Sequence, residues 1–128
     1  MKKLSSKNIP NALDEAVAML YAALSEKDKQ YIQQDPNWAE KSHHDFGLYL
    51  RNFWKFWNPQ STSLRLWFAQ NLQVAHPDDM SGTILKALSC KVNGEKFSPL
   101  KHVQNYRKHW KKMKRDPLVG DSAPITLV

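Results

Sequence analysis

The sequence of 128 residues has little of what marks disulfide-bonded or membrane-spanning proteins. It has one cysteine, Cys90, and no run of 18 apolar residues. A single thiol excludes an internal disulfide and is typical of a reducing compartment, so we expect a cytoplasmic protein. The missing apolar run excludes a membrane-spanning helix from the sequence. No apolar segment follows the basic start MKKLSSKNIP, so we expect no signal peptide.

Signatures of catalysis are also missing. The chain has no phosphate-binding glycine loop, no Ser-His-Asp order and no zinc-knuckle spacing. The string HPDDM at residues 76–80 could hold a divalent metal or share a proton between two carboxylates. The alternative, which we favour, is that Asp78 and Asp79 stabilise a helix N-terminus while His76 caps it or packs. We therefore predict a protein that is not an enzyme and has no metal and no cofactor.

The cluster of His43, His44 and Asp45 is the second candidate for a metal site. Adjacent residues on a helix point about 100° apart, so the three side chains cannot all face one ion. A bridge from one of them to His76 or Asp79 is geometrically possible. This alternative ranks below a structural role for the cluster.

Apolar residues at helical spacing dominate the chain and predict an all-α fold, a compact bundle of five to six helices. Helices are expected at residues 11–24, 25–34, 37–57, 64–72, 77–92 and 98–116. Asn11 is the expected N-cap of the first, and Ser25 with Asp28 forms a capping box for the second. Residues 37–57 are apolar nearly all round, so we expect the central, buried helix there.

Positive charge is concentrated at the two ends of the chain. Residues 1–8 carry three lysines, whereas residues 9–97 hold nine basic and ten acidic side chains, a net charge of −1. Residues 98–116 hold seven basic side chains and one aspartate, a net charge of +6, within a chain of net charge +7. We therefore expect a flexible basic lead at residues 1–10, a near-neutral body at 11–97, a basic helix at 98–116 and an irregular tail at 117–128.

The basic helix is expected to be amphipathic. Its narrow apolar stripe consists of Leu100, Val103, Tyr106, Trp110 and Met113. The residues that we expect to bind nucleic acid or another partner are Lys101, Tyr106, Arg107, Lys108, Trp110, Lys111, Lys112, Lys114 and Arg115. The lysines and arginines would contact phosphates, and Tyr106 or Trp110 could stack on an unpaired base. Packing of Trp110 into the core is the alternative.

Arg51 and Asn52 lie among aromatic residues and are expected to form a buried polar pair. A buried arginine needs a carboxylate, and Asp78 or Asp79 could provide it. The predicted structural polar cluster therefore contains Arg51, Asn52, His76, Asp78 and Asp79. Recognition of a ligand phosphate or carboxylate by Arg51 is the alternative.

Three segments together resemble an uncharacterised bacterial family of small domains of unknown function. They are IPNALDEAVAMLYAALSEKDKQYI at residues 9–32, FGLYLRNFWKFW at 46–57 and HPDDMSGTILKAL at 76–88. The resemblance covers roughly residues 9–95 and implies a helical family domain, placed here at 11–97, but no activity. The basic helix lies outside it.

The favoured function is a non-enzymatic module that contacts RNA, DNA or a nucleoprotein complex through the basic helix. The alternative is a protein-binding inhibitor or immunity-type factor, for example one encoded by a phage or mobile element that inhibits an RNA-guided nuclease or another defence enzyme. A third hypothesis, a helix on a membrane surface, ranks last because the apolar stripe is narrow.

Overall fold

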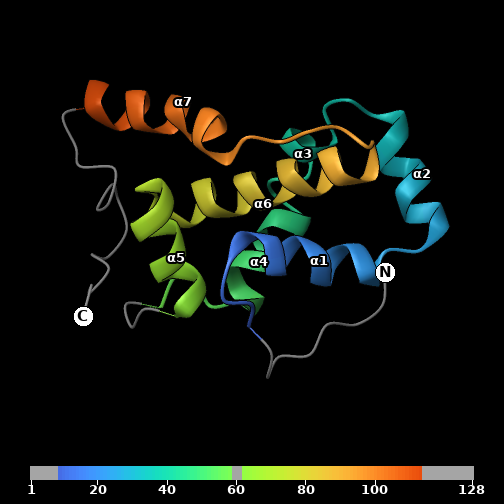
Figure 1. Ribbon diagram of the computed structural model, residues 1–128, viewed down its shortest axis with the longest axis horizontal. Helices are drawn as coiled ribbons and strands as arrows, with labels where there is room; N and C mark the ends of the chain where they lie inside the picture. Colours follow the sequence, from blue (N-terminus) through green and yellow to red (C-terminus); the bar gives the residue numbers. More distant parts are fainter. Residues whose placement is uncertain (1–8, 59–61, 114–128) are drawn as a thin grey trace.

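A computed structural model describes residues 9–58 and 62–113, and every regular element within these ranges is an α-helix (Figure 1). The seven helices are α1 (Leu13–Ala23), α2 (Glu26–Gln34), α3 (Trp38–Lys41), α4 (Phe46–Phe53), α5 (Ser63–Leu72), α6 (Pro77–Val92) and α7 (Pro99–Lys112). The predicted all-α bundle is confirmed, with one helix more than expected. The expected flexible lead lies almost entirely, and the irregular tail wholly, outside the described residues.

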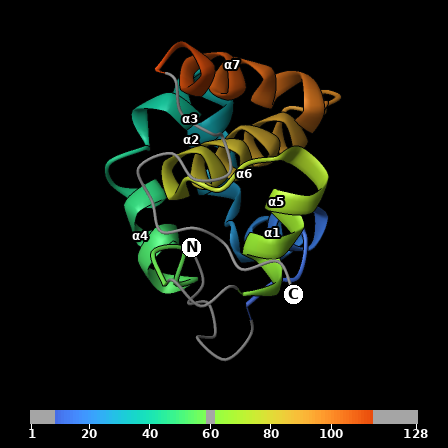
Figure 2. The ribbon, with the colours of Figure 1, turned by 90° about the vertical axis from the view of Figure 1, so that its left-hand side faces the viewer.

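Helix α6 lies at the centre of the bundle. It packs against α1, α2, α3, α4 and α7. Viewed from one end of the molecule, α3 and α4 lie on one side of α6, α1 and α5 lie on the other, and α7 covers the top (Figure 2). Small polar residues let α6 be buried on several sides, because Ser81, Thr83 and Ser89 are buried together with its apolar residues. The prediction that residues 37–57 form the central helix is therefore wrong.

The segment 37–57 divides into α3 and α4 around a turn at residues 42–45. Ser42 donates its backbone N–H to Trp38, and its carbonyl accepts the N–H of Gly47 at 2.8 Å. Asp45 then caps α4 through its side chain. Gly47 allows this close approach of two backbone segments, since an added Cβ there would lie 3.3 Å from the Ser42 carbonyl oxygen. Polar capping residues therefore end one helix and start the next without a proline.

Local capping signals mark most of the helix starts correctly. Ser25 and Asp28 form the predicted capping box of α2. Pro77 begins α6 after the N-cap His76, and Ser98 caps α7, which begins at Pro99. The first helix differs from the prediction, because its N-cap is Ala12 rather than Asn11. The backbone N–H of Asn11 donates to the Glu15 carboxylate at 2.8 Å.

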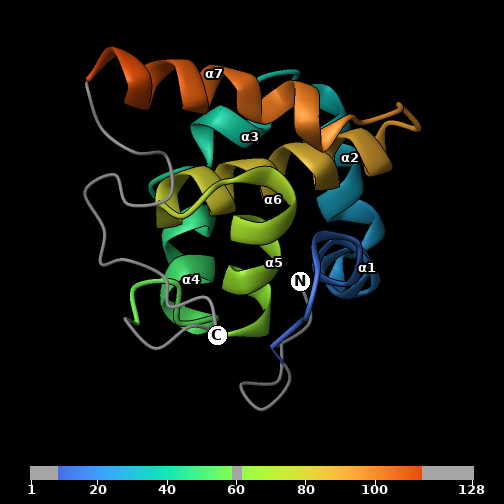
Figure 3. The same ribbon diagram turned by 60° about the vertical axis from the view of Figure 1, so that its left-hand side comes forward.

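The basic helix α7 packs on the body rather than projecting from it. It contacts α6 and α5 and runs above α6 in the view of Figure 3. Val103 and Trp110 are buried against the core, whereas Leu100 and Met113, at the two ends of the stripe, are exposed. Among the described residues, no helix is long and apolar enough to cross a membrane.

Candidate functional site

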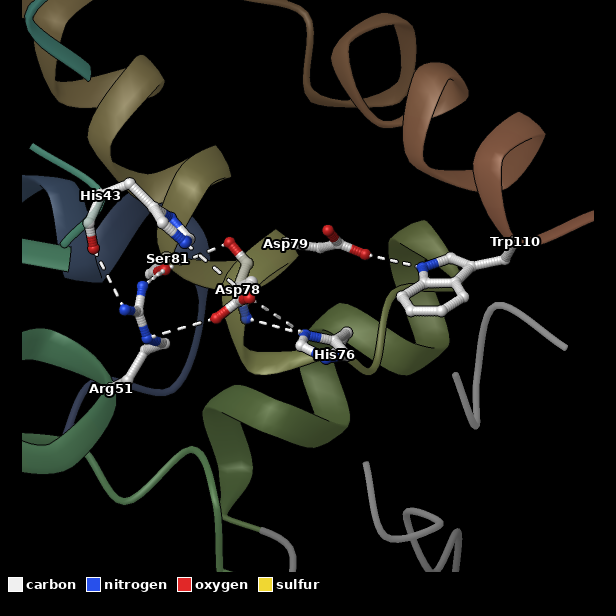
Figure 4. A network of polar contacts seen from close by, with 7 residues as sticks. All are labelled: His43, Arg51, His76, Asp78, Asp79, Ser81 and Trp110. Carbon is white, nitrogen blue, oxygen red and sulfur yellow. Dashed lines mark hydrogen bonds and ion pairs between the residues drawn. The ribbon is translucent and has the colours of Figure 1, made fainter. Parts of the chain in front are cut away.

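Arg51 lies at the centre of a partly buried polar network that joins α4 to α6 (Figure 4). Arg51 is only 4% exposed. Nε lies 3.4 Å from Asp78 Oδ1, one terminal nitrogen donates to Ser81 Oγ at 2.8 Å, and the other donates to the His43 carbonyl at 3.1 Å. The predicted carboxylate partner is thus confirmed as Asp78. With these partners the guanidinium is engaged in structure, which argues against ligand recognition by Arg51.

The network differs from the predicted cluster at two points. Asn52 is exposed, because adjacent helical residues point about 100° apart and Arg51 takes the inward direction. His43 and Ser81 belong to the network but were not predicted to do so. Ser81 follows Asp78 by three residues, the spacing that places two side chains on one helix face, so the sequence contained a usable signal for it. The contact with His43 uses its backbone carbonyl, which every residue has, so the residue type could not predict this contact.

Asp79 faces away from Arg51 and binds α7. Its Oδ2 accepts the indole N–H of Trp110 at 2.9 Å, and the Trp110 ring stacks on His76 with the centroids 5.4 Å apart. Trp110 is 6% exposed. His76 also caps α6, since its Nδ1 accepts the N–H of Asp78 at 3.1 Å. The string HPDDM therefore starts α6, holds α4 through Asp78 and docks α7 through Asp79, as Figure 4 shows.

Tyr106 is also engaged in docking α7. Its hydroxyl lies 2.9 Å from His102 Nε2, and burial raises the pKa of the phenol to about 12. The hydroxyl sits over Gly82 on α6, where an added Cβ would lie only 2.7 Å from the Tyr106 oxygen. Gly82 therefore leaves the space that the Tyr106 hydroxyl occupies.

Replacement of Gly82 by alanine is expected to lower the free energy of unfolding by about 1–2 kcal/mol. Displacing the Tyr106 ring costs about 1–3 kcal/mol, and the better helix propensity of alanine returns up to about 1 kcal/mol. In the Tyr106→Phe background the same replacement is expected to raise the free energy of unfolding, because the nearest remaining ring atom would lie 3.8 Å from the added Cβ. Urea denaturation of the four proteins tests this reversal, and an equal loss in both backgrounds would contradict it.

Burial raises the pKa of Asp79 above its ordinary value of 3.8, although the bond from Trp110 acts in the opposite direction. Between 3.8 and the raised value the folded protein binds more protons than the unfolded chain. The contribution of Asp79 to stability therefore decreases as the pH rises through this window.

The variant Asp79→Asn lacks this titration but keeps an oxygen that can accept from Trp110. Relative to wild type, it is expected to gain stability as the pH rises from below 3.8 to neutrality. The comparison with wild type cancels the protonation of His102, whose pKa burial lowers. Thermal melts across this pH range measure the difference, and a difference that stays constant with pH would show that Asp79 does not titrate as described.

Arg107 caps the end of α5 and is only partly exposed. Its Nε and one terminal nitrogen donate to the Leu72 carbonyl at 3.2 and 2.6 Å. A cation at the C-terminus of a helix is favourable because the helix dipole places partial negative charge there. Arg107, Tyr106 and Trp110, which were predicted to contact a partner, therefore contact the body instead.

Four of the predicted contact residues remain on the outer face of α7. They are Lys101, Lys108, Lys111 and Lys112, and all are exposed. Among the described residues, no carboxylate pairs with any of them. Lys114 and Arg115 lie outside the described residues. The structure thus separates an inner face of α7, which docks, from an outer face whose positive charge is not paired with any carboxylate in the described part of the chain. The docked apolar stripe is also the face that the membrane-surface hypothesis required.

Arg65 on α5 is a second buried arginine that sequence reasoning missed. It is 1% exposed and donates to the Asn58 carbonyl. Burial lowers its pKa, and within the described ranges no carboxylate lies in ion-pair contact with it. The sequence did not predict this burial, because an arginine within an apolar helix pattern can also point toward solvent.

A small cavity of about 280 Å³ lies where α3, α6 and α7 meet. Its lining includes His43, Asp78, Asp79, His102 and Tyr106, all of which have contacts described above. Burial lowers the pKa of His43, and the charge of Arg51 acts in the same direction. Among residues 9–58 and 62–113, no three His, Cys, Asp or Glu side chains are grouped so that they could hold a metal ion. These five lining residues are therefore already engaged in contacts within the protein.

Comparison with known proteins identifies a family. A search of the curated proteins and a search of the solved structures both gave no match. The model of a domain of unknown function, DUF6794, matches residues 9–92, which include α1 to α6 and all of HPDDM but not α7. The motifs predicted a resemblance to an uncharacterised family over nearly the same residues. The chain belongs to the DUF6794 family.

Proposed function

We propose that the protein is a non-enzymatic binding module that contacts the phosphates of RNA, DNA or a nucleoprotein complex through the outer face of α7. The observation that carries the proposal is the set of four exposed lysines on that face, Lys101, Lys108, Lys111 and Lys112, none of which pairs with a carboxylate in residues 9–58 or 62–113. Lys101 and Lys112 are eleven residues apart, which corresponds to about 16 Å along the helix axis. Such a row is long enough to contact several phosphates of one strand.

Docking gives this face a fixed shape. A helix as short as α7 is marginal in isolation, so its contacts with the body keep the lysines aligned before a partner arrives. Lysine contacts to phosphates release condensed counterions and carry no sequence information. Because Tyr106 and Trp110 face the body, stacking on bases is no longer part of the proposal. We therefore expect weak sequence preference.

Replacing Lys108, Lys111 and Lys112 by glutamine is expected to weaken binding to a labelled oligonucleotide at low salt by about tenfold or more. The matched control replaces Lys27, Lys91 and Lys96, which are exposed elsewhere, and lowers the net charge equally. Fluorescence anisotropy with single- and double-stranded RNA and DNA measures both variants. An equal loss in the two triple variants would show that net charge, rather than the face of α7, determines binding.

A protein partner remains the second candidate function, as an inhibitor or immunity-type factor. The same lysines could face an acidic protein surface or occupy the nucleic-acid channel of a nuclease. A complex that forms in host lysate, survives nuclease treatment and is lost in the Lys108, Lys111 and Lys112 variant would favour this alternative. Loss of every partner after nuclease treatment would favour nucleic acid.

A further inference from the structure

An open groove of about 580 Å³ lies among α2, α3 and α4, and no described residue of α7 lines it. Its apolar lining includes Leu24, Ile32, Trp38 and Phe46. A volume of this size falls in the range of sites that bind small ligands or several side chains of a peptide. The groove therefore has the capacity for a partner that does not use the lysine face.

Two tyrosines on the groove are unusually exposed. Tyr31 of α2 is 67% exposed, and Tyr49 of α4 is 40% exposed. Tyr49 is held in place by stacking on Phe53, with ring centroids 5.2 Å apart. Exposed aromatic side chains beside an apolar groove are typical of binding surfaces, because they bury a large area with little loss of conformational entropy.

The polar part of the groove is acidic. Its described charged lining residues are Asp28, Asp35, Asp45 and Lys41, a net charge of −2 in a chain of net charge +7. Lys41 is already paired with Asp35 at 3.0 Å. The groove thus differs in sign from the rest of the molecule, and especially from α7.

The backbone fixes the positions of these carboxylates. Asp35 accepts the N–H of Asn37 at 2.9 Å, and Asp45 accepts the N–H of Phe46. The bond from Asn37 is the main reason that the pKa of Asp35 lies below its usual value, and the Lys41 ammonium adds to the effect. A cationic side chain entering the groove would meet the Asp45 carboxylate, which has no cationic partner among the described residues, beside the Asp35–Lys41 pair. Both carboxylates are already held in position, which favours specific association.

We propose that this groove binds a positively charged peptide segment of a partner protein, which inserts apolar side chains between Tyr31 and Tyr49 and places lysines or arginines against Asp35 and Asp45. The apolar lining accounts for the first contact and the fixed carboxylates for the second. Such a site would be independent of phosphate binding by α7, so one molecule could link a basic protein segment to a nucleic acid.

The test uses short fluorescein-labelled synthetic peptides of leucine and lysine at helical spacing. Companion peptides carry glutamate in place of lysine, or serine in place of leucine. The full chain is expected to bind the leucine–lysine peptide and neither companion, with amide chemical-shift changes in α2, α3 and α4. Failure to bind any peptide, or shift changes confined to other helices, would overturn the proposal.

Variants locate the contact. The double variant Asp35→Asn and Asp45→Asn keeps side-chain oxygens for the backbone bonds but removes both charges, and it is expected to weaken peptide binding about tenfold or more. Tyr49→Ala should have a comparable effect. The control is Leu48→Ser, since Leu48 is 45% exposed on the same helix but does not line the groove. Equal affinity of all these proteins for the peptide would contradict the proposal.

A second copy of the chain is the competing occupant, because its basic α7 has the complementary charge. Sedimentation without peptide distinguishes the two. A monomer at all concentrations supports a partner protein, whereas dimers that dissociate in the Asp35→Asn and Asp45→Asn variant would assign the groove to a second copy and overturn the proposal. Unchanged peptide binding by the Lys108, Lys111 and Lys112 variant would show that the groove and the lysine face act separately.

Discussion

Replacing Asp78 by alanine is expected to lower the free energy of unfolding by about 3–5 kcal/mol, because it leaves the Arg51 guanidinium buried without a carboxylate. Arg51 is 4% exposed and cannot turn to water, whereas the Asp78 side chain is 42% exposed. Removal of the arginine, as in Arg51→Met, leaves a carboxylate that water can reach. We therefore expect Arg51→Met to cost less than Asp78→Ala, and the double variant to cost less than the sum of the two.

The matched control for Asp78→Ala is Asp14→Ala. Asp14 occupies the same second position of helix α1 but is exposed and has no ion pair among the described residues. Its loss reports only the interaction of a carboxylate with a helix N-terminus, worth about 0.3–1 kcal/mol. Urea denaturation of the single and double variants gives the comparison. Similar losses for Asp78→Ala and Asp14→Ala would show that the buried network contributes little.

Replacing Trp110 by alanine is expected to cost about 3–5 kcal/mol, the usual loss for a large buried aromatic side chain. The indole fills the contact between α7 and α6, stacks on His76 and donates to Asp79. Trp110→Phe keeps most of the packing but removes the donor, so we expect a smaller loss of about 1–3 kcal/mol. Hydrogen exchange of the α7 amides should accelerate strongly in the alanine variant.

Met113→Ala is the control for Trp110→Ala. Met113 belongs to the same predicted apolar stripe but is 53% exposed, so its truncation should change the free energy of unfolding by less than about 0.5 kcal/mol. If Trp110→Ala were as mild as Met113→Ala, and α7 exchange stayed slow, α7 would not depend on Trp110 for docking.

Features set by neighbouring residues were predictable from the sequence. The capping box of Ser25, the start of α6 at Pro77 and the start of α7 at Pro99 all depend on side chains within a few positions of the helix end. The break within residues 37–57 also depends on local caps, at Ser42 and Asp45. It was missed because abundant aromatic residues suggested one continuous buried helix.

Features set by distant residues were predictable only in part. The need of Arg51 for a carboxylate narrowed the predicted partner to Asp78 or Asp79, and the structure shows that it is Asp78. The bond from Trp110 to Asp79, 31 residues away, and that from Arg107 to the Leu72 carbonyl follow from how α7 lies on the body. The residue types of α7 alone do not show that Arg107 points toward the body while the lysines point toward solvent. The expected partner contacts therefore included three residues that dock the helix.

The division of α7 into two faces also changes how its function should be tested. Deletion of residues 98–128 would expose the core that Val103 and Trp110 cover, so a loss of binding could reflect damage to the body. Substitution of exposed lysines leaves the docked face intact. Position-specific charge removal therefore separates binding from folding more cleanly than truncation does.

The most direct test of the central claim, that the outer face of α7 binds phosphates, is the salt dependence of binding to duplex DNA. If Lys101, Lys108, Lys111 and Lys112 each neutralise one phosphate, the slope of log K against log salt should be about −3.6 or steeper, since each contributes about −0.9. Replacing Lys108, Lys111 and Lys112 by glutamine should make the slope shallower by about 2.7, while the Lys27, Lys91 and Lys96 control keeps it. A slope that is the same in both variants, or no binding by wild type at low salt, would contradict the claim.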